Sequence, residues 1–200
     1  MARNEARGDA GVEGNSRLTA QVAVILLLLL FVVGLTVPVA HSQTRWHVFL
    51  GVLVIPPVLL KVASTTWRFV KYYAGSRAYR RKGPPMLVLR LLGPIVVVLT
   101  LTLLFSGVGL VVGAPRSLRP LLSQIHHASF LLWFVVMTIH VLGHLRETAS
   151  LAPRDFLRRR GRAVTGAFAR PVATLLSVGI GLVCAWAILP YVTAAGYLSR

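Results

Sequence analysis

The sequence predicts an all-α fold, a polytopic transmembrane helix bundle with five spans. The 200 residues are 56% hydrophobic and only 14% charged, whereas soluble domains carry about 25% charged residues. Several apolar runs are long enough to cross a bilayer, which takes about 20 helical residues. No acidic residue occurs between Glu13 and Glu147, and the basic residues gather at the ends of the apolar runs. This arrangement is typical of membrane topology.

The net charge of +17 follows from this arrangement, so we expect membrane lipid, and no nucleic acid, as a partner. Cys184 is the only cysteine. A single cysteine excludes an internal disulfide, a thiolate-bound iron–sulfur cluster and a covalent CxxCH haem site. Any haem must therefore be held without a covalent link to the chain.

The expected elements follow one another with short connections. Residues 1–17 are polar without apolar periodicity, and we interpret them as a disordered cytoplasmic tail. Residues 148–170 are a basic loop, and residues 171–200 hold the last span and a short outer tail. The five spans are expected at residues 18–40, 46–73, 86–112, 120–146 and 171–191.

The basic residues predict the orientation of the chain in a plasma membrane. Lysine and arginine are frequent in the loops after the second and fourth spans and rare in the other two. The positive-inside rule then places the N-terminus in the cytoplasm and the C-terminus outside.

Four of the six histidines lie on the fourth expected span: His126, His127, His140 and His144. The fourteen residues from His126 to His140 bring both to within roughly 40° of one helix face, about 21 Å apart along the axis. Two imidazoles at two depths on one buried face are what two stacked metal centres in a membrane require.

The outer centre is predicted from His47 and His126, which lie at matched depth on different spans. Bis-histidine ligation of haem b needs one imidazole from each of two helices. Gly51, one turn below His47, would leave room for the edge of the porphyrin. Two alternatives stay open: His127 replaces His126 as the ligand, or these histidines only contact headgroups and loop carbonyls.

The inner centre would use His140 or His144, which are one turn apart. Lys61 lies fourteen residues after His47 on the same face, and ionisable residues inside a bilayer usually serve a function. Lys61 could ligate haem as the neutral amine, bond a propionate, contact a quinone, or extend to the interface. The two histidines could also bind a transition metal, but no carboxylate is expected beside them.

Residues 45–85 and the segment IHHASFLLWFVVMTIHVLGHLRE (125–147) resemble the membrane subunits of bacterial b-type cytochromes, such as those of formate dehydrogenase and nickel–iron hydrogenase. The resemblance covers residues 18–147 and is to a small, actinobacterial-like member. It implies a four-helix cytochrome b-like core with an extra C-terminal span, and His47, His126 and His140 as haem ligands. The family's fourth ligand lies on the first span, which has no histidine here, so one or two haems are implied.

The resemblance implies an electron-transfer subunit rather than a stand-alone enzyme. It would carry electrons between a partner subunit, such as a molybdopterin-type oxidoreductase, and quinone or another carrier. One alternative is a cofactor-free anchor or assembly protein. Another is a small transporter with Lys61, His140 and His144 as a proton relay and a broken helix at Pro56–Pro57.

Overall fold

The computed structural model describes residues 2–40, 44–83, 86–156, 164 and 166–194. Over these residues the chain is helical and contains no strand. Five of its helices are long and apolar enough to cross a membrane. The prediction of an all-α, polytopic bundle is confirmed, and the protein is a multi-pass membrane protein.

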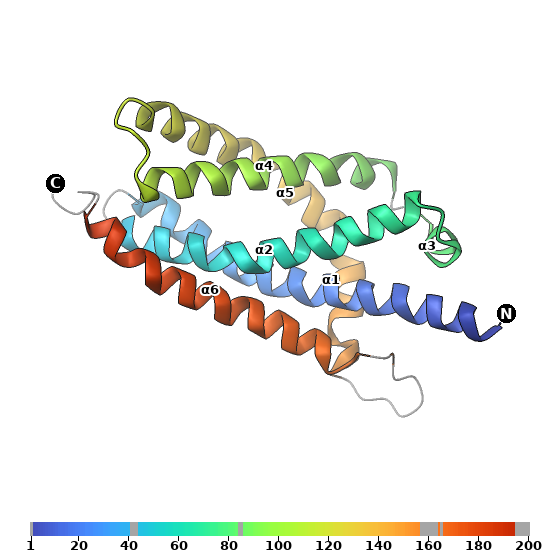
Figure 1. Cartoon of the computed structure of the whole chain (residues 1–200). Helices are drawn as coiled ribbons and strands as arrows, with labels where there is room; N and C mark the ends of the chain where they lie inside the picture. Colours follow the sequence, from blue (N-terminus) through green and yellow to red (C-terminus); the bar gives the residue numbers. More distant parts are fainter. Residues whose placement is uncertain (1, 41–43, 84–85, 157–163, 165, 195–200) are drawn as a thin grey trace.

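Five long helices run back and forth along the bundle (Figure 1). Short connections between them make successive long helices antiparallel, so α1 begins and α6 ends at opposite ends of the bundle. The long helices are α1 (Ala2–Thr36), α2 (Thr44–Tyr73), α4 (Leu87–Val112), α5 (Arg119–Leu151) and α6 (Ala169–Ala194). The short ones are η1 (Val37–Val39), α3 (Arg77–Lys82) and η2 (Ala152–Asp155).

The helices form two packed groups. Helix α2 packs on both α1 and α6, while α4 packs on α5. Helix α2 touches α4, and α1 touches α5, across the seam between the two groups. In Figure 1, α4 lies above α2, and α5 passes behind the other helices toward the start of α6.

Apolar side chains face both inward and outward. Val22, Leu26, Val54 and Val58 form a buried cluster between α1 and α2. On the outside, the side chain of Phe105 is 71% exposed. Exposed aromatic and aliphatic residues are unfavourable in water but suit hydrocarbon, and a helix satisfies its own backbone hydrogen bonds there.

Close helix contacts depend on small residues and on paired polar groups. A Cβ atom added to Gly181 of α6 would lie 2.2 Å from the carbonyl oxygen of Leu53 in α2. Only glycine permits this approach of the two backbones. Between α4 and α5, the buried Trp133 Nε1 donates a hydrogen bond of 2.8 Å to Thr100 Oγ1. This bond satisfies the indole N–H in an apolar setting.

The expected disordered tail over residues 1–17 is wrong for the described part, because helix α1 begins at Ala2. Its first turns project past the apolar part of the span and carry charged side chains that find partners on other elements. Asp9 pairs with Arg81, and Arg17 pairs with Asp155. These contacts lie at one end of the bundle, where α1 begins, α3 lies and α5 ends; we call it the charged end.

Two further expectations change at this end. Helix α5 continues to Leu151 and then into η2, so it extends beyond the expected boundary between residues 147 and 148. Residues 157–163 and 165 of the expected basic loop lie outside the described residues. Helix α2 runs through Pro56 and Pro57 as one helix, so the broken helix of the transporter alternative is wrong.

Candidate functional site

Two histidines from different helix groups meet at the seam. His47 lies in the first turn of α2 and His126 in the second turn of α5. Their ring centroids are 6.4 Å apart and the ring planes are nearly perpendicular, at 88°. We call these two residues the imidazole pair. The sequence predicted that they lie at matched depth, and the structure brings them together.

The hydrogen bonds of His47 determine its tautomer. Thr36 Oγ1 lies 2.7 Å from His47 Nδ1 and donates its own hydrogen to the carbonyl oxygen of Val33, at 2.6 Å. A threonine hydroxyl has one hydrogen to donate, so Thr36 must accept a hydrogen bond from Nδ1–H. The neutral ring therefore has its lone pair on Nε2.

His126 has the same tautomer. Its Nδ1 lies 3.1 Å from the carbonyl oxygen of Leu103, which can only accept a hydrogen bond. Ser106 Oγ, at 3.2 Å from the same nitrogen, donates to the carbonyl oxygen of Thr102. The hydrogen of His126 is thus on Nδ1, and both members of the pair present an unprotonated Nε2, the form that binds a metal ion.

The spacing of the pair suits a shared ion. With metal–nitrogen bonds of roughly 2.0–2.1 Å and ring nitrogens about 1.1 Å from the ring centre, two imidazoles on opposite sides of one ion have centroids about 6 Å apart. The observed centroid distance is 6.4 Å. The centroid distance of the imidazole pair is therefore close to that of two imidazoles that hold one ion.

Glycines lie beside both rings. A Cβ atom added to Gly107 of α4 would lie 3.0 Å from His126 Cε1, so a larger residue would displace the ring. A Cβ atom added to Gly51 would meet nothing within 4 Å. Packing therefore does not require glycine at position 51, and the space one turn below His47 is open.

His127 differs from its neighbour. Its side chain is exposed, and its Nδ1 lies 2.8 Å from the carbonyl oxygen of Ser123 on the same helix. The structure thus gives His127 a contact within α5, whereas His126 contacts α4 and faces His47 on α2.

The predicted inner residues lie apart from the imidazole pair. Lys61 Nζ donates a hydrogen bond of 2.9 Å to the carbonyl oxygen of Thr19 on α1. The rings of His140 and His144 are 4.8 Å apart. His140 Nδ1 is enclosed and has no hydrogen-bond partner. Among the described histidines, only those of α5 lie at this depth, so no imidazole from another helix faces His140.

The expectation that no carboxylate lies beside His140 and His144 is wrong. Glu147 Oε2 is 3.6 Å from His144 Nδ1, and Glu147 Oε1 is 3.8 Å from Lys82 Nζ. Helical periodicity could have revealed the first contact, because residues three apart share a face. No group of three or more metal-binding side chains occurs among the described residues, so the transition-metal alternative gains no support.

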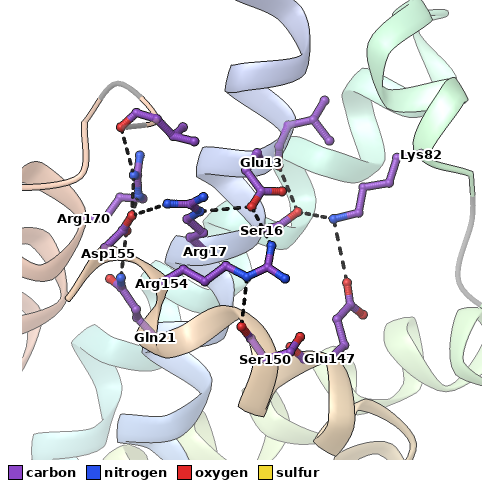
Figure 2. Close-up of polar contacts among 12 residues, drawn as sticks. Glu13, Ser16, Arg17, Gln21, Lys82, Glu147, Ser150, Arg154, Asp155 and Arg170 are labelled. Atoms are coloured by element: carbon purple, nitrogen blue, oxygen red, sulfur yellow. Dashed lines mark hydrogen bonds and ion pairs between the residues drawn. The ribbon is translucent and has the colours of Figure 1, made fainter. Parts of the chain in front are cut away.

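Charged side chains connect five elements at the charged end, α1, α3, α5, η2 and α6 (Figure 2). The carboxylate of Asp155 is fully enclosed and contacts Arg17, Arg170 and Gln21 at 2.6 to 3.0 Å. We call these four residues the Asp155 cluster. Lys82 also hydrogen-bonds Ser16 of α1. Partial burial there, with Arg68 nearby, lowers the pKa of Lys82.

The chain gives no match to a described protein family, to a curated protein or to a solved structure.

Proposed function

We propose that His47 and His126 would hold one haem b, and that the protein is a membrane-embedded electron-transfer subunit. The observation that carries the proposal is the imidazole pair, with both Nε2 atoms unprotonated and the centroids 6.4 Å apart. Bis-histidine haem centres in membranes use one imidazole from each of two helices.

The chain's own residues would orient and tune the ligands. Thr36 and the Leu103 carbonyl accept the Nδ1–H bonds, which fixes each ring's orientation and makes its Nε2 more basic. Gly107 lets the His126 ring lie close to α4. Both residues of the pair are half-buried between the helices. When bound, the haem would supply one-electron redox chemistry.

One haem is proposed rather than two. His140 has no imidazole opposite it among the described residues, and the Lys61 ammonium already donates to the Thr19 carbonyl. In this proposal the electrons pass between a partner oxidoreductase, such as one of the molybdopterin type, and quinone or another carrier. The charged end is placed in the cytoplasm, by the distribution of lysine and arginine.

The test is a reduced-minus-oxidised absorption spectrum of the purified full chain, with pyridine haemochrome quantitation. We expect about one haem per chain, and a reduced α-band of the b type. His47→Ala and His126→Ala should each abolish haem binding while the chain still inserts.

His127→Ala is the matched control, because this residue adjoins His126 in the sequence but bonds back to its own helix. It should retain full haem content. A colourless wild-type protein after haem-supplemented expression would overturn the proposal and favour the cofactor-free anchor. Full haem content in His126→Ala would overturn the ligand assignment.

A further inference from the structure

One face of α5 carries a row of titratable side chains between the interior and the charged end. His140, His144 and Glu147 are four and three residues apart, so they lie on one helix face. The row covers about 10 Å along the axis at 1.5 Å per residue. We call these three residues the α5 row. It is separate from the imidazole pair, so a role for this row does not depend on haem binding.

The members of the α5 row form a chain of contacts that opens toward water. The ring centroids of His140 and His144 are 4.8 Å apart, and His144 Nδ1 is 3.6 Å from Glu147. The Nδ1 atom of His140 is enclosed, the His144 side chain is 28% exposed, and that of Glu147 is 45% exposed. Glu147 is therefore the end of the row that is open to water, and the enclosed nitrogen of His140 is at the interior end.

The surroundings of the row do not give His140 a structural role. Its enclosed Nδ1 has no partner, and an unsatisfied polar atom in such a position destabilises a fold. An apolar side chain of similar size would fill the space without that cost. Ionisable residues kept within a membrane span at such a cost generally mark a functional path.

Charged groups from the neighbouring elements face the row. Helix α2 contributes Lys61 and Arg68, which act electrostatically on His140 and Glu147, respectively. Helix α3 contributes Lys82, which pairs with Glu147, and Glu13 of α1 acts on Lys82 in turn. Helix α4 packs the apolar Leu89 against α5 at Gly143.

The geometry points to a proton-transfer path along the α5 row, from the charged end of the bundle to His140. A proton from water binds the Glu147 carboxylate. His144 accepts that proton on one ring nitrogen and releases the proton of its other nitrogen toward His140. Glu147 and His144 are then back in their starting charge states, and His140 is an imidazolium. The same steps in reverse return the proton to water when the pH rises.

The test follows solvent exchange of the His140 ring proton by nuclear magnetic resonance, on the full chain with ¹⁵N-labelled histidine in lipid nanodiscs. The signal is assigned by its loss in His140→Phe. In the wild type we expect fast exchange with water. In His144→Phe the exchange should slow by about a hundredfold, the size of effect that a positioned proton-transferring group gives.

Two variants of Glu147 keep the test independent of folding, because this side chain is partly exposed and its loss should not disrupt packing. Glu147→Gln should slow the exchange, and Glu147→Asp should retain it. His127→Phe, at the other end of α5, should leave it unchanged. Equal exchange in the wild type, His144→Phe and Glu147→Gln would overturn the path, as would a sealed His140 in the wild type. Neither result depends on the haem content of the protein.

Discussion

At the scale of single residues, the enclosed carboxylate of Asp155 is the strongest determinant of stability at the charged end. It is held between two arginines from different helices, with Gln21 as a third partner. Asp155→Asn should lower the free energy of unfolding by roughly 3–5 kcal/mol, because it removes an enclosed counter-charge that both Arg17 and Arg170 contact. Chemical unfolding in a mild detergent would measure this difference.

Asp9→Asn is the matched control, since it removes the same charge from an exposed pair with Arg81. We expect a change within about 1 kcal/mol, as for other surface ion pairs. Equal losses in the two variants would show that the Asp155 cluster contributes no more than a surface contact.

Thr36→Val tests the orientation of His47. The change keeps the shape of the side chain and removes the oxygen that accepts the Nδ1–H bond. If haem binds as proposed, its affinity should fall by about 10–100-fold, as is typical for the loss of a second-sphere partner. Haem titration of the apoprotein would measure it. Thr138→Val, whose hydroxyl bonds within its own helix, should leave the affinity unchanged.

These residues mark the limit of what could be predicted from the sequence. The spacing of His126 and His140, and the matched depth of His47, followed from helical geometry alone. The roles of Thr36 and the Leu103 carbonyl did not, because they depend on which helices become neighbours and how each is rotated. Glu147 lay within reach of helical periodicity, but the fourth span was expected to end at residue 146.

At the scale of helices, the contact between α2 and α6 depends on Gly181. Gly181→Ala would place a methyl group 2.2 Å from a backbone oxygen, and backbone moves less readily than a side chain. We expect a loss of about 1–3 kcal/mol, the usual effect of overpacking. Thermal unfolding followed by circular dichroism would measure it.

Gly179→Ala serves as the comparison, because an added Cβ there meets nothing within 4 Å. Alanine favours helix over glycine by about 1 kcal/mol at either position, so the difference between the two variants isolates the contact with α2. A Gly181→Ala protein as stable as Gly179→Ala would contradict the close approach.

The sequence predicted which segments form helices, but not which helices pack against one another. Hydropathy predicts which segments cross the membrane. These segments are helical because unpaired backbone groups are costly in lipid. The pairing of α2 with α6 depends instead on one glycine and on the shapes of facing side chains. The helical start of α1 was missed because its charged residues are stabilised by partners far away in the sequence.

At the scale of the whole molecule, the two ends of the bundle differ in charge, and this difference predicts orientation. In a Cys184→Ala background, Arg77→Cys introduces a cysteine at the charged end of the bundle. Ser117→Cys introduces one at the opposite end. We expect a membrane-impermeant maleimide to label the Ser117 cysteine in intact cells and the Arg77 cysteine only after lysis. The reverse pattern would invert the topology.

The Asp155 cluster also has a consequence for biosynthesis. Its members come from the first helix, from η2 and from the start of the last helix, so Arg170 emerges from the ribosome after the others. Until then, Arg17 and Asp155 lie near the membrane surface without Arg170 beside them. Completion of this cluster therefore coincides with insertion of the last helix. A chain that stopped short of α6 would expose the carboxylate of Asp155, a feature by which quality control could distinguish an unfinished protein from a finished one.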